Sequence, residues 1–191
     1  MDVCLAAGAL LLLAPLLGVI AACVWLEEPR APVIFRQRRC GYGGRSFQLF
    51  KFRTMVRDAD ALKDALRARS LVPWPDFRVV NDPRVTRVGR FLRRSSFDEL
   101  PQLVNVLRGE MSLVGPRPTS FDASTYALWQ TGRLEYRPGI TGPWQVYGRG
   151  CLDFEERCRL EIGFFRRRSI TRELWLLIQT LGCVMRRTGV A

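Results

Sequence analysis

The 191-residue chain contains no histidine, no CxxC pair and almost no lysine. The absence of histidine excludes histidine general bases, Ser-His triads and histidine-containing metal sites. Its six cysteines are scattered, which disfavours structural zinc and a disulfide framework and predicts reduced, mostly buried thiols on the cytosolic side. The glycine-rich stretch Pro138 to Arg149 matches neither GxxxxGK[ST] nor GxGxxG, so an ATPase or a dinucleotide enzyme is disfavoured.

Acidic residues are scarce beside basic ones, with 18 Asp and Glu against 30 Lys and Arg and a formal net charge of +12. Almost all of the cations are arginine, the better planar and bidentate partner for phosphate. Nucleic acid, anionic lipid head groups and phosphorylated small substrates are therefore candidate partners. The sequence shows no helix-turn-helix, zinc or RNP motif, and an apolar anchor suits a nucleic-acid binder poorly, so we expect no nucleic-acid partner.

One long apolar segment, Val3 to Leu26, carries no charge. As a helix it is long enough, at about 1.5 Å per residue, to cross a hydrocarbon core ~30 Å thick. A signal peptide fits poorly, because no basic region precedes the segment and no small-residue cleavage site follows it. Arginines follow it closely, which predicts that the downstream domain lies in the cytoplasm.

Pro15 lies near the middle of this segment and is expected to bend it, because proline donates no N–H and its ring presses on the carbonyl of Leu11. Two arrangements are open. A kinked helix could span the bilayer, or a broken helix could enter and leave by the same face, which would make the protein monotopic. Composition alone favours the spanning helix, since proline is ordinary in membrane helices.

The remaining length allows one globular domain. Pro32 to Met55 predicts two short strands around a turn at Gly41–Gly44, and Lys51 and Arg53 would share one face of the second strand. Leu71 to Pro83 is rich in proline and predicts a loop. Its aromatic residues suit either insertion into the membrane interface or a small core; they are Trp74 and Phe77.

Apolar spacing of the helical kind predicts four further helices, with the third tolerating Pro101 only near its start. They cover Asp58–Arg69, Arg84–Arg94, Ser96–Leu107 and Thr171–Arg187. The second is amphipathic, with a basic face suited to head groups or a phosphate pocket. The apolar face predicted for the last helix comprises Leu174, Leu177, Ile178, Leu181 and Val184.

Asp98 and Glu99 are adjacent acids in an arginine-rich segment. Taken alone, Ser96 to Glu99 is most simply interpreted as a helix capping box. The alternative is chemical, because both carboxylates could reach one Mg²⁺ or one phosphate from a helix N-terminus, with Arg93 and Arg117 near in sequence. Since histidine and a motif cysteine are lacking, a carboxylate is the most plausible nucleophile, and its attack on a phosphoryl group would give an acyl phosphate.

Two rigid loops could present arginine to a phosphate. The two prolines of Gly115–Pro118 fix the backbone around Arg117. The glycines of Pro138 to Arg149 allow tight turns, and Arg149 ends that stretch. A plain turn is an equally good interpretation of the first loop.

Taken together, three long stretches resemble the bacterial sugar transferase family, the monotopic polyprenyl-phosphate phosphoglycosyl transferases, in its short form. They are PVIFRQRRCGYGGRSFQLFKFRTM, NDPRVTRVGRFLRRSSFDELPQLVNVLRGEMSLVGPRP and RPGITGPWQVYGR, and the C-terminal SITRELWLLIQTLGCVMRRTGV matches more loosely. The resemblance implies an α/β fold: a small mixed domain of interfacial amphipathic helices around a short sheet. It also implies a re-entrant helix in residues 1–29, broken at Ala14–Pro15, and a catalytic domain in residues 30–191 on the cytoplasmic face of the bacterial inner membrane.

The resemblance further implies transfer of a phosphosugar from a nucleotide diphosphosugar, usually a UDP-sugar, to polyprenol phosphate. UMP is the by-product of this ping-pong reaction, which is the first membrane step of surface glycan synthesis. Asp98 would carry the phosphosugar and Glu99 would bind Mg²⁺. Phosphate-site arginines would be Arg93, Arg117 and Arg149, and we add Lys51 and Arg53 as substrate-binding candidates.

Some residues depart from the family pattern, since Glu161 and Glu173 stand where aspartate is usual. The sequence leaves open the sugar, the polyprenol, the glycan pathway and the oligomeric state, a homodimer included. The alternative function is a non-enzymatic, basic membrane adaptor that binds anionic lipid.

Overall fold

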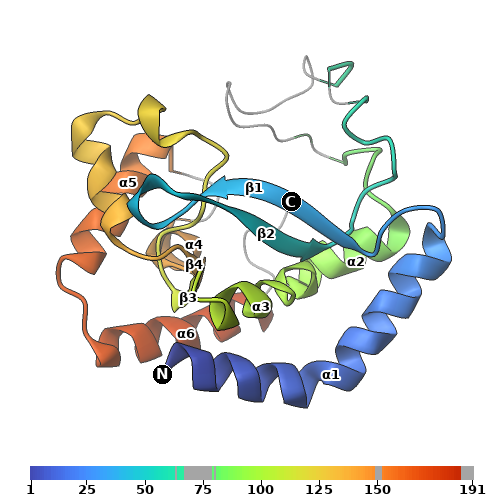
Figure 1. Cartoon of the computed structure of the whole chain (residues 1–191), viewed down its shortest axis with the longest axis horizontal. Coiled ribbons are helices and arrows are strands. Elements are labelled where there is room, and N and C mark those ends of the chain that lie inside the picture. Colours follow the sequence, from blue (N-terminus) through green and yellow to red (C-terminus); the bar gives the residue numbers. More distant parts are fainter. Residues whose placement is uncertain (63, 67–78, 80, 149–151, 186–191) are drawn as a thin grey trace.

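The computed structural model describes residues 1–62, 64–66, 79, 81–148 and 152–185. It is a mixed structure of helices and short strands with one apolar helix at its N-terminus, α1 (Asp2–Glu27). A hairpin of β1 (Ile34–Cys40) and β2 (Ser46–Phe52) crosses the middle of the molecule, and helices surround it (Figure 1).

The hairpin confirms the two predicted strands. β1 and β2 are antiparallel, with Ile34 opposite Phe52 and Cys40 opposite Ser46. The short turn η1 (Tyr42–Gly44) joins them, and its two glycines take positive φ angles of 61° and 76° that other residues rarely adopt.

Two helices follow near the hairpin, α2 (Arg87–Ser95) and α3 (Gln102–Leu107), with the short turn η3 (Phe97–Glu99) between them. The helix predicted roughly over Ser96–Leu107 is therefore confirmed only from Gln102 onward, and the capping box at Ser96 does not form. Ser96 takes a left-handed conformation (φ 59°) and donates its N–H back to α2, so it ends one helix and makes no side-chain cap for the next.

The helix predicted over Arg84–Arg94 begins three residues later, at Arg87, because Thr86 is its N-cap and accepts the Gly89 N–H at 2.9 Å. Arg84 instead pairs with Asp82 at 2.6 Å and donates to the Ala59 carbonyl at 3.1 Å.

No helix forms in the described part of Asp58–Arg69, where residues 58–62 and 64–66 make turns. This prediction was wrong there, and the Ala59 carbonyl accepts from Arg84. Trp74 and Phe77 of the predicted loop lie outside the described residues.

The second half of the chain forms a small parallel sheet covered by helices. β3 (Ser112–Val114) pairs with β4 (Gly139–Thr141). The short turns η4 (Ala123–Thr125) and η5 (Leu128–Glu135) lie between these strands in the sequence. Three helices follow: α4 (Pro143–Tyr147), α5 (Phe154–Phe165) and α6 (Ile170–Met185).

The last predicted helix is confirmed as α6, but only part of its predicted apolar face packs against the domain. Leu176 and Glu173 are buried, whereas Ile178 and Leu181 of the predicted apolar face are 60% and 65% exposed. Leu176 packs with Val114 of β3 and Phe165 of α5, and Leu177 packs against the same cluster, whereas Leu174 is exposed as well. The helix therefore presents apolar side chains on an open face as well as a packed one.

The described cysteines form no disulfide with one another. Cys40 and Cys158 are buried, but Cys4 and Cys23 are exposed on α1 and Cys183 is half-buried, so the prediction of mostly buried thiols was wrong. The exposed pair lies in α1 because that helix packs only a narrow stripe on the domain.

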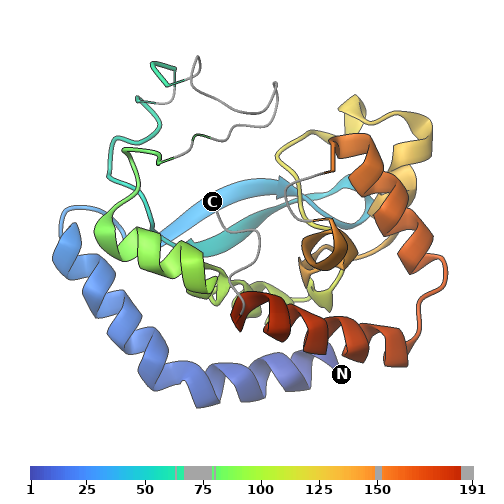
Figure 2. The same ribbon diagram turned by 180° about the vertical axis from the view of Figure 1, so that it is seen from behind.

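α1 is one helix that bends sharply near its middle, as expected for Pro15, and it lies along the lower side of the molecule (Figures 1 and 2). Its first half packs Ala6 against Leu49 of β2 and Leu103 of α3. Its second half packs on β2 and α2, with a cluster of Ile20, Val24, Phe52 and Leu92. Both halves therefore rest on the same domain.

Polar contacts fasten both ends of α1 to that domain. Asp2 accepts a hydrogen bond from the Ser112 hydroxyl. Glu27 accepts the N–H groups of Arg87 and Val88 at 2.7 and 3.1 Å, where a carboxylate satisfies the free donors of the α2 N-terminus. The bend of α1 projects away from the domain, and the exposed fractions of Leu11 and Leu12 there are 81% and 80%.

Gly89 allows α2 to approach the end of β2. A Cβ added there would lie 2.1 Å from the Thr54 carbonyl oxygen, so Gly89→Ala is expected to destabilise the fold by about 2 kcal/mol through overpacking. Gly163 of α5 is the matched control, because no atom lies within 4 Å of its added Cβ and alanine favours a helix by up to ~1 kcal/mol. Thermal unfolding of both variants should give shifts of opposite sign, and equal shifts would contradict the close approach.

Candidate active site

The acid pair lies where three segments meet. η3 carries Asp98 and Glu99, β2 brings Lys51, and the loop after β3 brings Arg117. Glu99 Oε1 accepts from Lys51 Nζ at 2.8 Å and from Arg117 Nη2 at 2.7 Å, and a second Arg117 nitrogen lies 3.4 Å from Oε2. Although burial opposes its ionisation, these two cations hold the pKa of Glu99 well below its usual range.

Asp98 is in a different state from its neighbour. It is buried, and its carboxylate makes no hydrogen bond or ion pair with any residue in the described part of the chain. Burial raises the pKa of Asp98. The positive charges of Lys51, Arg93 and Arg117 each lower it by less, with Lys51 having the largest effect of the three. Within the described part of the chain, the site thus contains one carboxylate bound by cations and one that lies among cations without a hydrogen bond or ion pair to them.

The structure brings three of the predicted substrate-binding residues to the acid pair: Lys51, Arg93 and Arg117. Arg93 is fixed by donating Nε to Thr54 Oγ1 at 2.9 Å, and burial lowers its pKa. Arg53 lies just beyond β2, where it donates to the Pro32 carbonyl at 2.7 Å. No contact among the described residues joins Arg53 to the acids, and Arg149 lies outside those residues.

Two buried residues hold the backbone of Arg117. Glu161 of α5 accepts its N–H at 2.9 Å, and Arg133 of η5 donates to its carbonyl at 2.7 Å. Glu161 and Arg133 also pair with each other at 2.6 Å and are 0% and 5% exposed. Clamping both backbone groups fixes the direction in which the Arg117 side chain leaves the loop, which is toward Glu99.

Sequence reasoning missed Arg133 and the whole of α5. One signal could have revealed the helix: Asp153 and Glu156 form a capping box, with Asp153 accepting the Glu156 N–H at 2.8 Å. The role of Arg133 had no local signal, because its partners lie 16 and 28 residues away in the sequence.

The acid pair fits the modest ligand needs of Mg²⁺. The described residues contain no group of three or more His, Cys, Asp or Glu side chains placed to hold a metal ion. Mg²⁺ in phosphate-transfer sites usually needs only one or two carboxylates, with substrate phosphates and water completing its shell. Glu99 and Asp98 supply that number, although Glu99 would have to share its oxygens with Lys51 and Arg117.

Comparison with known proteins identifies the family. The family model described as bacterial sugar transferase matches residues 1–187. The chain belongs to the bacterial sugar transferase family. This family member is similar to the galactosyl transferase CpsE of Streptococcus agalactiae serotype III (strain NEM316), with 40% identity over 166 residues, 86% of the chain and 37% of CpsE.

For two shorter relatives, the match covers a larger share of the relative's own length. The exopolysaccharide production protein ExoY of Rhizobium meliloti (strain 1021) is 37% identical over 193 residues, 98% of the chain and 85% of ExoY. The UDP-glucose:undecaprenyl-phosphate glucose-1-phosphate transferase of Caulobacter vibrioides (strain ATCC 19089 / CIP 103742 / CB 15) is 41% identical over 190 residues, 95% of the chain and 67% of that protein. The chain spans 36% to 41% of four longer relatives, among them CpsE.

Proposed function

We propose that the protein is a phosphoglycosyl transferase that moves a phosphosugar from a UDP-sugar to polyprenol phosphate. The observation that carries this proposal is the buried Asp98 carboxylate, which lies among the charges of Lys51, Arg93 and Arg117 and makes no hydrogen bond or ion pair with the described residues. Such an arrangement suits a nucleophile for a substrate whose phosphates those cations can neutralise. The names of relatives support the substrate class, since one is an undecaprenyl-phosphate galactose phosphotransferase of Salmonella typhimurium and the Caulobacter relative uses UDP-glucose.

In the first half-reaction, an Asp98 carboxylate oxygen attacks the phosphorus that bears the sugar. The bond from that phosphorus to the bridging oxygen of the diphosphate breaks, UMP leaves, and the sugar phosphate remains on Asp98 as an acyl phosphate. Lys51 and Arg117 lie beside the same carboxylate pair, where their charge would stabilise the phosphoryl oxygens as the new bond forms.

In the second half-reaction, a phosphate oxygen of polyprenol phosphate attacks the same phosphorus. The acyl bond breaks, polyprenyl-diphosphate sugar leaves, and Asp98 returns to a free carboxylate. Charge balances in both steps without a general base, which is consistent with a chain that has no histidine. Mg²⁺, held by Glu99 with Asp98 beside it, would neutralise charge on the diphosphate.

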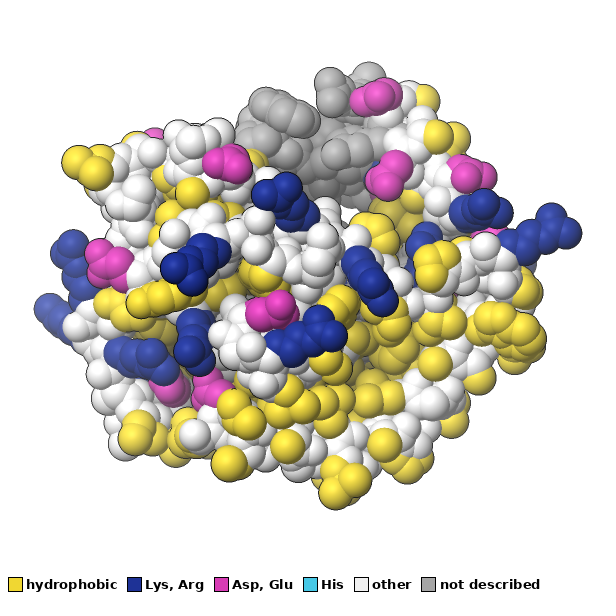
Figure 3. Space-filling view, viewed as in Figure 1, with side chains coloured by type: hydrophobic (Ala, Val, Ile, Leu, Met, Phe, Trp, Pro, Cys, Tyr) yellow, Lys and Arg dark blue, Asp and Glu magenta, His cyan; other side chains and the backbone are white. Residues whose placement is uncertain are grey.

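A bilayer is the proposed setting for this reaction. α1 is long and apolar enough to cross a membrane, and only 11% of its most apolar window is buried in the protein. Figure 3 shows apolar side chains gathered along the lower face, where Figures 1 and 2 place α1 and α6. Exposed residues on these helices include Leu11, Leu12, Trp25, Leu174, Trp175 and Ile178. This apolar face suits the cytoplasmic leaflet of the bacterial inner membrane, where polyprenol phosphate would be presented.

The contacts of α1 support a re-entrant rather than a spanning helix. Asp2 and Glu27 at its two ends bind the same domain, so both ends would lie on one side of the bilayer. The arginines that follow the helix favour the cytoplasmic side. Leu11 and Leu12, at the bend, would then reach deepest into the hydrocarbon.

Cysteine labelling tests this topology. In a background whose native cysteines are replaced, cysteine introduced at Val3 or at Pro29 should react with a membrane-impermeant maleimide in inside-out vesicles, and neither should react in intact spheroplasts. Opposite accessibility of the two positions would establish a spanning helix instead.

Intact mass tests the proposed function. Purified protein mixed with Mg²⁺ and a panel of UDP-sugars, without polyprenol phosphate, should gain one phosphosugar that maps to Asp98, and addition of polyprenol phosphate should remove it with release of UMP. A folded protein that releases UMP from none of these sugars in the presence of acceptor, yet binds anionic vesicles in a salt-sensitive way, would be an adaptor.

A further inference from the structure

A cavity of about 210 Å³ opens beside the loop that carries Arg117. β1, the 117–121 loop, η5, α4 and α5 all contribute to its wall. Among the described residues that line it, four arginines face one acid: Arg39, Arg117, Arg133 and Arg157 against Glu161. Because the lining is strongly cationic, the cavity favours an anionic or carbonyl-rich ligand.

Aromatic rings line the same cavity, namely Phe121, Trp144 and Phe154. Phe121 meets Phe154 edge to face, with ring centroids 5.0 Å apart. The Arg157 guanidinium lies 5.3 Å from the centre of a Trp144 ring. Aromatic faces and guanidinium planes together are the surface on which proteins stack nucleic-acid bases, while arginine also pairs with phosphate oxygens.

The cavity and the acid pair share Arg117. Its guanidinium binds Glu99, while the residue itself and its backbone clamp, Glu161 and Arg133, line the cavity. Arg39 pairs with Phe47 at the end of the hairpin that is distant from Lys51. Phe47 precedes Lys51 by four residues on β2, a separation of ~13 Å along the strand. A ligand in the cavity would therefore have one end near Arg117 and the other end near Arg39, farther from Asp98.

We infer that this cavity binds the nucleoside end of the donor, with the pyrimidine ring against Phe121 and Trp144 and the nucleotide phosphate toward Arg117 and Arg157. The inference rests on the proposed function and specifies its donor site. The volume is below the ~300–1,000 Å³ of a pocket for a whole drug-sized ligand, so it suits one end of a nucleotide sugar. An uncharged hexose suits it less well, because the only acid in the described lining is already bound to Arg117 and Arg133.

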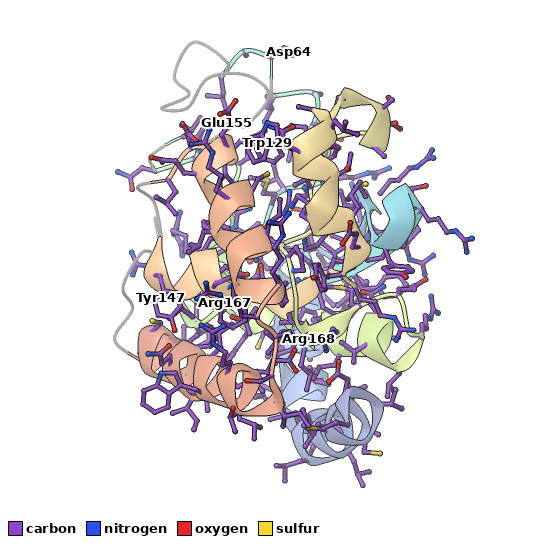
Figure 4. All side chains as sticks on the ribbon, turned by 90° about the vertical axis from the view of Figure 1, so that its left-hand side faces the viewer. Asp64, Trp129, Tyr147, Glu155, Arg167 and Arg168 are labelled. Atoms are coloured by element: carbon purple, nitrogen blue, oxygen red, sulfur yellow. The ribbon has the colours of Figure 1, made fainter. Side chains whose placement is uncertain are left out.

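Binding of UMP, which has the nucleoside and no sugar, tests the inference directly by calorimetry. Arg157→Gln and Phe121→Leu are each expected to weaken UMP binding about tenfold or more and to raise KM for the UDP-sugar. Arg159→Gln is the matched control. Arg159 is on the same helix and its guanidinium lies 5.4 Å from a Trp129 ring, but neither residue lines the cavity. Figure 4 shows Trp129 and Glu155, the ion-pair partner of Arg159, near one end of α5.

The control should bind UMP like the unmodified protein, and thermal unfolding should show that all three variants are folded. Unchanged UMP affinity in Arg157→Gln and Phe121→Leu would overturn the inference. If these variants bound UMP normally but had a raised KM for the UDP-sugar, the cavity would bind the sugar instead. UMP binding is measured without turnover. A protein that binds UMP through these residues but forms no adduct would therefore retain the inferred site and refute the proposed transferase.

Discussion

Replacing Asp98 by asparagine should abolish both half-reactions while leaving the protein folded. The amide has nearly the same shape but cannot form an acyl phosphate, so UMP release with acceptor present should fall at least about a thousandfold, a barrier increase of ~4 kcal/mol. The same variant should also fail to exchange labelled UMP into the UDP-sugar in the absence of acceptor. Loss of exchange distinguishes a missing nucleophile from poor acceptor binding.

The same substitution should stabilise the protein or leave its stability unchanged. The Asp98 carboxylate is buried without a hydrogen bond from the described residues, and burial raises its pKa, so the folded state disfavours its charge. Thermal unfolding in EDTA is the measurement. Asp58→Asn, at an exposed position, is the control and should change neither turnover nor stability. Turnover retained in Asp98→Asn would remove Asp98 from the mechanism.

Glu99→Gln is expected to act on stability with the opposite sign. Glu99 joins Lys51 at 2.8 Å and Arg117 at 2.7 Å, and its side chain is only 16% exposed. Removing the carboxylate leaves two half-buried cations without their partner, which should lower the free energy of unfolding by about 3 kcal/mol. Turnover should fall by about a hundredfold or more, ~2.7 kcal/mol, because Arg117 loses its anchor and the proposed Mg²⁺ ligand is lost.

The pH dependence of this stabilisation follows from the sign of the shift. The pKa of Glu99 is lowered in the folded state, so its contribution is present above the unfolded pKa and lost only as the pH falls toward the folded value. The difference in stability between Glu99→Gln and the unmodified protein should therefore persist at neutral pH and shrink in acid. Glu155→Gln is the matched control, because it breaks an exposed ion pair with Arg159 and should cost less than ~1 kcal/mol. If Glu99→Gln and Glu155→Gln lowered the free energy of unfolding in urea equally, the ion pairs of Glu99 with Lys51 and Arg117 would not stabilise the fold more than an exposed pair does.

Much of the site could be predicted from the sequence because its signals are local. The hairpin follows from β-forming residues around a glycine turn, and Lys51 was predicted on it. The acid pair and the proline-fixed Arg117 loop were both recognised in one continuous stretch. The bend in α1 followed from Pro15, since a missing N–H acts on the same helix that contains it.

Tertiary contacts overruled other local patterns. Ser96 to Glu99 has the sequence of a capping box, but Ser96 ends α2 in a left-handed conformation. Asp98 and Glu99 therefore lie on the separate short turn η3. Residues 58–62 form turns despite their helical pattern, and the Ala59 carbonyl accepts from Arg84, which is 25 residues away in the sequence. On α6, Leu174, Ile178 and Leu181 face outward because Leu176, with Leu177 beside it, packs against β3 and α5.

The sequence by itself determined which chemical groups this protein has: a long apolar segment, two adjacent carboxylates, many arginines and no histidine. Only the tertiary structure decided that Glu99 is bound by two cations while Asp98 has no such partner among the described residues, and that Arg133 and Glu161 orient Arg117. Only it fastened both ends of α1 to one domain. The physical reason is that residue type and periodicity act over one or two turns, whereas the pairing of buried charges depends on partners that chain folding brings together from distant segments.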